Sequence, residues 1–197
     1  MLDGLDSTLE LLLKRELPPD IPSGDTEVFI SFVTPYQGAI KQKPAINLFL
    51  YDVQENLELR NSAWSVERQS SGRAKRKRPP ARVDCSYLIT AWPQNDEDVQ
   101  TEHQLLGEVM KVLLRYRKLP ENFVADNLEG QELPLRLISL RPSNLQSFGE
   151  FWQAMGGKEG TRPKVVLHCT VTISVPVDET GEEVRLVGVY QPKTGDR

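Results

Sequence analysis

The segment Asn47–Val53 constrains the fold of this chain more than any other part of its sequence. Its apolar side chains fall on both faces of an extended strand, with Leu48 and Leu50 on one face and Phe49, Tyr51 and Val53 on the other. Strands that are apolar on both faces occur inside sheets that are covered on both faces. The segment therefore predicts a strand at the centre of the fold.

Helical periodicity occurs in three other places. Leucines at positions 2, 5, 9 and 12 form a stripe that ends before Pro18. The acids and capping residues of Asn95–Asp98 open a second helix. Its expected inward stripe consists of Val99, His103, Leu106, Met110 and Leu113. A capping box at Ser143–Gln146 opens a third helix, which carries Trp152 and ends at Gly156.

Further strands are predicted at 28–33, 83–92, 133–140 and 165–177. A turn at 178–183 and a return at 184–190 predict a C-terminal β-hairpin. Strands and helices do not alternate regularly along the chain. This order favours an α+β fold with a mainly antiparallel or mixed central sheet and helices packed on it.

A chain of 197 residues is long enough for one domain with a full core. We expect residues 1–190 to form that single domain. The polar, arginine-rich stretch at about 55–80 is expected to be a long exposed loop or an elaborated hairpin that joins two strands. Residues 191–197 are expected to form a flexible C-terminal tail.

The charge and the start of the chain exclude several classes of protein. A net charge of −4 argues against a globally basic nucleic-acid binder. The start Met1–Asp6 is acidic where a secretory signal is basic, and Leu11–Leu13 is too short for the apolar part of such a signal. No segment approaches the roughly 20 apolar residues that cross a bilayer. We therefore expect a cytoplasmic protein without a transmembrane segment.

The residues that could take part in catalysis or bind a metal ion do not form a recognisable site in the sequence. Cys85 and Cys169 fall at inward positions of predicted strands and are expected to be buried thiols rather than a disulfide. The two histidines, His103 and His168, do not pair with a cysteine at metal-ligand spacing. Glu102 and His103 are neighbours on a helix, so they point about 100° apart. We predict no catalytic residue, no cofactor and no metal site, and we place His103 in the core or at an interface.

The strongest local anomaly is a basic run, in which five of the six residues from Arg73 to Arg78 are cationic. Such a run can bind an acidic protein surface, or it can be a solvated loop without a specific partner. It lacks the interleaved aromatic residues that stack on nucleic-acid bases. The predicted protein-interface residues are Trp64, which lies in the same polar stretch, Arg73, Lys75, Arg76, Lys77 and Arg78, together with Tyr190, Gln191 and Lys193 near the C-terminus.

Several segments, taken in order, resemble one protein family. They are the N-terminal leucine-striped helix, Asn47–Asn56 with Leu59-Arg60-Asn61, Pro79-Pro80 followed by Asp84, Tyr87 and Thr90-Ala91, Glu102-His103 through Gly107, and Phe151-Trp152 leading through Arg162-Pro163 into the last long strand. Together they span most of residues 1–177. The family is that of the cap, or tail-terminator, proteins of phage-tail-like extracellular contractile injection systems.

This resemblance implies a structural role without catalysis. Members of the family close the distal end of an inner tube and a contractile sheath, usually as a ring of six copies. The implied partners are further copies of the chain, the sheath protein and the inner-tube protein, within a particle that is later released or anchored to a membrane. The rival hypothesis is an adaptor domain that binds an acidic protein surface or nucleic acid through Arg73–Arg78.

Overall fold

A computed structural model describes residues 1–21, 27–68, 73–128, 131, 135–140, 148–156, 163–177 and 184–185. The chain divides into two compact units. The first unit comprises Met1–Glu55 and Val83–Ile173, and the second unit comprises Asn56–Arg82 and Ser174–Arg197. A single domain over residues 1–190 stays a prediction, and the tail 191–197 lies outside the described residues.

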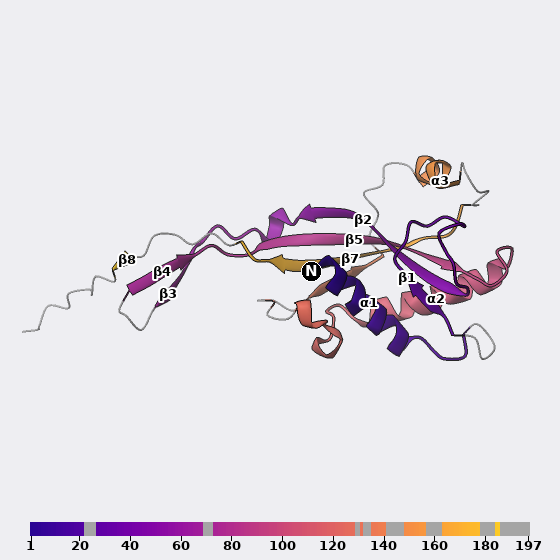
Figure 1. Cartoon of the computed structure of the whole chain (residues 1–197), viewed down its shortest axis with the longest axis horizontal. Coiled ribbons are helices and arrows are strands. Elements are labelled where there is room, and N and C mark those ends of the chain that lie inside the picture. The colour runs from indigo at the N-terminus through magenta and orange to yellow at the C-terminus, as the bar shows by residue number, and fades with distance from the viewer. Residues whose placement is uncertain are drawn as a thin grey trace, which may run out of the picture. The chain divides into compact units, whose positions relative to one another are not determined.

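The first unit is built on a five-stranded mixed sheet with the strand order β1-β2-β5-β7-β6 (Figure 1). Its strands are β1 (Phe29–Ser31), β2 (Ala45–Glu55), β5 (Ala81–Trp92), β6 (Arg136–Ser139) and β7 (Leu167–Val175). Strand β1 pairs parallel with β2, whereas β2 pairs antiparallel with β5 and β6 pairs antiparallel with β7. Together with the helices, this sheet confirms the predicted α+β class.

The central strand is β5 and not β2, so the predicted position of Asn47–Val53 is wrong. Strand β1 pairs only with Ala45–Asn47, and burial decreases along β2 until Val53 is 47% exposed. Strand β5 is buried throughout Cys85–Trp92 although its sequence alternates with polar residues. Those polar side chains tolerate burial because they are hydrogen-bonded, Ser86 to β7 and Thr90 by accepting from Trp92 Nε1 at 2.9 Å.

The cross-sheet hydrogen bonds join β5 to β7. The hydroxyl oxygens of Ser86 and Thr170 lie 3.1 Å apart, and the Thr172 hydroxyl donates to Asp84 Oδ1 at 2.6 Å. A polar alternation in the sequence is typical of a half-exposed strand. Here the second polar row on β7 supplies the partners, and β5 can occupy the centre of the sheet.

Helices lie on both faces of this sheet (Figure 1). On one face, α1 (Leu2–Glu16) and α2 (Val99–Arg115) pack, and the Tyr87 hydroxyl on β5 donates to Asp6 Oδ1 on α1 at 2.7 Å. On the other face lies α3 (Phe148–Gly156), whose Phe151 ring is 6.5 Å from that of Phe49 on β2. The short turns η2 (Glu121–Phe123) and η3 (Asp126–Leu128) follow α2 and pack on α1.

The predicted start of α2 is confirmed, but its inward stripe is rotated. Asp98 caps the helix by accepting from the Thr101 amide at 3.0 Å. The buried residues of α2 are Glu102, Leu105, Leu106, Val109, Val112 and Leu113. Val99, His103 and Met110 are exposed instead, because the buried face is centred on Leu105, Val109 and Val112. The prediction of His103 in the core is therefore wrong, and nothing in the described residues tests it at an interface.

The second unit contains a hairpin within the stretch that joins β2 to β5. After the turn η1 (Leu57–Leu59), β3 (Ser65–Arg68) and β4 (Arg73–Lys77) pair antiparallel, and β8 (Val184–Arg185) pairs with the other side of β4. The elaborated hairpin is therefore what forms in this stretch. The predicted C-terminal hairpin of β7 with 184–190 is wrong, because β5 and β6 occupy both edges of β7. Residues 186–190 lie outside the described residues.

Candidate protein interface

The basic run forms a strand of the second unit. Residues Arg73–Lys77 are β4, the middle strand of the order β3-β4-β8. In its register, Glu67 lies opposite Lys75, and Arg73 lies opposite Arg185. The Ser65 hydroxyl donates to the Lys77 carbonyl at 3.2 Å and ties the open end of the hairpin.

The structure gives the exposure of some predicted interface residues and only the strand position of others. Lys77 and Arg78 are exposed, and Trp64 is half-buried just before β3. Arg73, Lys75 and Arg76 are placed by the strand register. Tyr190, Gln191 and Lys193 lie outside the described residues. The assignment of all nine residues to an interface stays a prediction.

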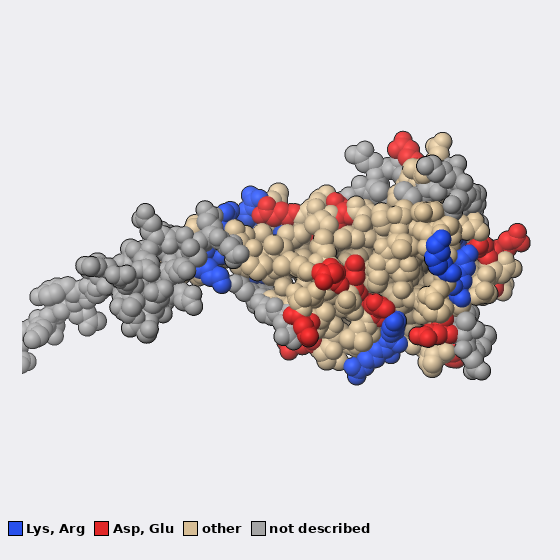
Figure 2. Space-filling model, in the orientation of Figure 1, with Lys and Arg blue, Asp and Glu red and all other residues tan. Residues whose placement is uncertain are grey.

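The two units differ in charge. By sequence, the stretch 56–82 carries eight basic and two acidic side chains, and the whole second unit carries 11 basic and 7 acidic ones, which gives +4. The first unit carries 13 basic and 21 acidic side chains, which gives −8. Figure 2 shows acidic side chains spread over one face of the first unit. A charged partner would therefore be attracted to one unit and repelled by the other.

Within the first unit, a buried ion pair joins α2 to the segment before β7. Lys164 Nζ lies 2.7 Å from Glu102 Oε2, and both side chains are at most 2% exposed. Lys164 Nζ also lies 4.5 Å from the centre of the Trp92 ring, and Lys43, which pairs with Asp96, lies 5.8 Å from that centre. Because the pair is enclosed by protein, it fixes packing and offers no open position to a ligand.

The thiols and the tyrosine of the sheet are held in their neutral forms. Burial raises the pKa of Cys85 to about 11 and that of Cys169 to about 12, and both cysteines are free, as predicted. Burial, with the nearby Asp6 carboxylate, raises the pKa of Tyr87 above its ordinary value. Burial also lowers the pKa of His168 below 6.5. Thiols in this state are poor nucleophiles at neutral pH.

A hollow on the first unit has a volume of about 390 Å³. It is lined by Lys14, Leu17, Pro18, Pro19, Ile21, Glu27 and Val28. Across the parts of the chain that the structure describes, no group of three or more His, Cys, Asp or Glu side chains is placed to hold a metal ion. Among the helices in those parts, none combines the length and the apolar character that a bilayer crossing needs.

Sequence reasoning missed a second basic surface, in the first unit. Lys118 and Arg136 lie opposite each other in an isolated antiparallel bridge, and the neighbouring Arg117 carbonyl accepts from the Leu137 amide at 3.0 Å. In the sequence alone, Lys111, Arg115, Arg117 and Lys118 suit the negative end of the dipole of α2 and indicate nothing further. Their meeting with Arg136 on β6 depends on a tertiary pairing that no local pattern encodes.

Seven chains of solved structures match this chain, and they include two terminators. One is the sheath/tube terminator of an extracellular contractile injection system, PVC, in its extended state, with a TM-score of 0.67, 24% identity, and coverage of 100% of this chain and 64% of that chain. The other is the anti-feeding prophage cap, described as the AFP tube terminating cap, with a TM-score of 0.59, 24% identity, and coverage of 97% and 60%. The chain thus spans less than two thirds of the length of either relative. A search of the curated proteins finds no match.

The fold defines an α+β domain of the kind found in those terminators. At the level of sequence, residues 4–187 match the Pvc16 N-terminal domain. The chain belongs to the Pvc16 N-terminal domain family. The resemblance stated from the sequence is confirmed at this level.

Proposed function

We propose that this chain is a structural cap that terminates the inner tube and the contractile sheath of a phage-tail-like contractile injection system. One observation carries the proposal: the family match extends over residues 4–187, and the fold matches two solved terminators over 100% and 97% of the chain. No group of the first unit described above supports a catalytic alternative, since its thiols are neutral and its buried acid is paired.

The cap acts as a ring of identical copies, six in number, that closes the distal end of the particle. Its partners are further copies of itself, the sheath protein and the inner-tube protein. It assembles in the cytoplasm as part of the particle, which is later released or anchored to a membrane. Stopping a polymer requires one surface that matches the last ring and another that cannot template the next ring.

The test is to image injection particles from producing cells that lack this gene. Loss of a defined cap, with sheaths of uncontrolled length or tubes without sheath, is the expected result. Re-expression of the chain should restore capped particles of uniform length. Capped particles of unchanged length in the deletion strain would refute the proposal.

Within this function, the basic hairpin is a contact to an acidic ring of the tube or the sheath. The support is the excess of eight basic over two acidic side chains in 56–82 and the exposure of Lys77 and Arg78. Contacts of this kind weaken with salt. Attachment of the chain to capless particles should therefore fall steeply between about 0.1 M and 1 M salt, where the Debye length shortens from about 10 Å to about 3 Å.

The rival function is an adaptor domain that binds nucleic acid through the same stretch. The favouring observation is again the charge of 56–82. A gel-shift titration with double- and single-stranded DNA at physiological salt separates the two hypotheses. A cap should bind only weakly and without preference, with a dissociation constant no tighter than the non-specific range of about 10⁻⁴ to 10⁻⁶ M.

A further inference from the structure

One edge of the first unit is basic although that unit as a whole is acidic. Five of its 13 basic side chains lie at the end of α2 and on β6, namely Lys111, Arg115, Arg117, Lys118 and Arg136. All five are exposed, and two of them are paired with acids, Lys111 with Glu108 at 2.6 Å and Arg115 with Glu16 at 2.7 Å. Lys118 and Arg136 face each other directly across the bridge between their segments. Like charges in that position repel each other, so the arrangement lowers the stability of the free chain.

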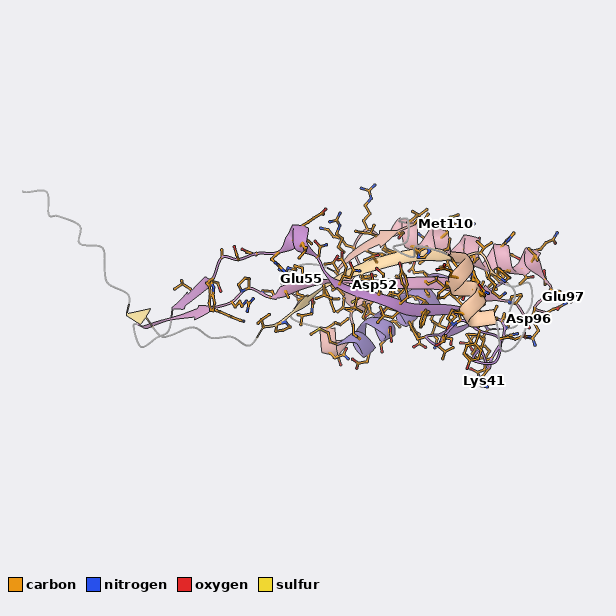
Figure 3. The ribbon with its side chains drawn as sticks, turned by 90° about the horizontal axis from the view of Figure 1, so that it is seen from above. Lys41, Asp52, Glu55, Asp96, Glu97 and Met110 are labelled. Carbon is orange, nitrogen blue, oxygen red and sulfur yellow. The ribbon has the colours of Figure 1, made fainter. Side chains whose placement is uncertain are left out.

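Apolar side chains lie beside these cations. Met110 and Leu114, one helical turn apart on α2, are 36% and 55% exposed. Leu140, which follows β6, is 40% exposed and has a φ of 57°, which is unusual for a residue with a large side chain. The Ser139 hydroxyl donates to the Leu113 carbonyl at 3.0 Å, so α2 and the end of β6 are joined. We call this surface of α2, 117–118 and β6 the β6 edge, and Figure 3 shows Met110 on the outer side of α2.

The opposite edge of the same sheet carries the opposite charge. Strand β1 pairs with β2 only at Ala45–Asn47, and among the described residues no strand pairs with the rest of β2 on the side away from β5. This part of β2 carries Asp52 and the exposed Glu55, which Figure 3 labels, together with the half-exposed Val53. It has no basic residue. We call it the β2 edge.

We propose that the β6 edge of one copy of this chain binds the β2 edge of a second copy. Strand β6 ends the strand order on one side, and on the other side only the short β1 follows β2. The two edges carry opposite charges, and each includes exposed apolar side chains. Apolar centres with charged rims are the usual anatomy of protein interfaces. The proposal depends on the ring stated under the proposed function and assigns the surfaces that form it.

The charges also select the symmetry of the contact. A two-fold contact would bring two β6 edges together and place the three cations of Arg117, Lys118 and Arg136 against an identical set. A head-to-tail contact instead pairs cations with Asp52 and Glu55. Contacts of this second kind use different patches on each copy and close into a ring when the rotation between copies permits it.

The test uses the purified full chain in analytical ultracentrifugation at low and high salt. The wild type should self-associate at low salt and dissociate as salt rises. The variant R117E/K118E/R136E and the variant D52K/E55K should each associate about tenfold or more weakly, since several surface ion pairs are lost or reversed together. The variant that combines all five changes should regain association, because the complementary charges have only exchanged edges.

Matched controls keep the result specific. Lys41→Glu and Glu97→Lys reverse exposed charges on the first unit away from both edges, as Figure 3 labels them, and should leave association unchanged. Met110→Gln with Leu114→Gln should weaken association at high as well as low salt, whereas Leu11→Gln on α1, which is 48% exposed, should not. Unchanged circular dichroism of each variant shows that the fold is retained.

Two results would overturn the assignment. One is a wild-type chain that stays monomeric at about 100 μM in low salt, a concentration at which a contact of even modest affinity is populated. The other is that the wild type self-associates and the edge variants self-associate equally well. Either result leaves the cap function standing if the deletion strain still loses its caps, so the two proposals fail separately.

Discussion

The two units of this chain differ in their buried hydrophobic residues and in their net charge. Every buried hydrophobic residue found in the described parts of the chain belongs to the first unit, which carries a net charge of −8. The second unit, at +4, presents Leu57 and Val66 more than half exposed on a turn and a two-stranded hairpin extended by β8. Small sheets of this kind are marginal in water without a covered face. The comparison indicates that the first unit supplies stability, and it supports the contact role proposed for the second unit.

The sharpest way to break this comparison is to disrupt the buried ion pair of the first unit. Lys164→Met leaves the Glu102 carboxylate buried without its cation, which should lower the free energy of unfolding by about 3–5 kcal/mol. Urea denaturation at pH 7 measures the loss. The double variant Glu102→Leu/Lys164→Met should recover most of it, because no buried charge remains.

The half-exposed pair of Lys43 and Asp96 is the matched control for that experiment. Its side chains are 16% and 33% exposed, so Lys43→Met should cost only about 1 kcal/mol or less. Equal losses for Lys164→Met and Lys43→Met would show that burial does not set the strength of the pair. The account of the first unit as the stable unit would then lose its main support.

A smaller loss is expected from the apolar core. Ile89 on the central strand β5 is fully buried, and Ile89→Val should lower the free energy of unfolding by about 0.5–1.5 kcal/mol. Val66 on β3 is 56% exposed, and Val66→Ala should change that free energy by less than about 0.5 kcal/mol although it removes more carbon. Chemical denaturation of the two variants compares the units directly. A larger loss at Val66 would contradict the comparison.

Lowering the pH from about 6.5 to 5 should lower the free energy of unfolding of the first unit, which contains His168. Burial lowers the pKa of His168 below its unfolded value of 6.5, so the unfolded chain binds a proton that the folded chain does not. Stability is therefore full above about pH 6.5 and is lost as the pH falls below it. The variant His168→Asn should flatten this dependence in denaturation curves.

The smallest effect on stability is expected in the second unit. Reversing Lys77 and Arg78 to Glu should leave the free energy of unfolding within about 0.5 kcal/mol, because both side chains are exposed. The same variant should lose salt-sensitive attachment to capless particles, measured by co-sedimentation. Lys41→Glu, an exposed reversal on the first unit, is its control. Unchanged attachment would remove the hairpin from the proposed contact.

Local patterns were enough to predict the elements but not their places. The cap at Asp98 was predicted because its hydrogen bond to Thr101 lies within one helical turn. The face of α2 that turns inward depends on what packs against it, and Glu102 is buried only because Lys164, 62 residues later, supplies its partner. The central place of β5 has the same origin, since its polar row is bonded by Thr170 and Thr172.

The candidate interface residues also differ in whether the sequence alone could reveal them. The basic run was visible in the sequence because its charges are consecutive, and the structure adds that it is the middle strand of a small sheet. The pairing of Lys118 with Arg136 was not visible, because a bridge between distant segments brings the two side chains together. Contacts that arise only from tertiary pairing leave no periodic signal in a single sequence.

The pairing of β4 with β8 has a consequence for the order of events in the cell. Arg73 lies opposite Arg185, so the third strand of the basic sheet is synthesised 112 residues after the second. Pairings at such separation form late, after local contacts have closed the intervening chain. During synthesis the core strands of the first unit leave the ribosome before the basic sheet can be completed. A nascent chain therefore acquires the third strand of its basic sheet only after the core strands of the first unit have been made.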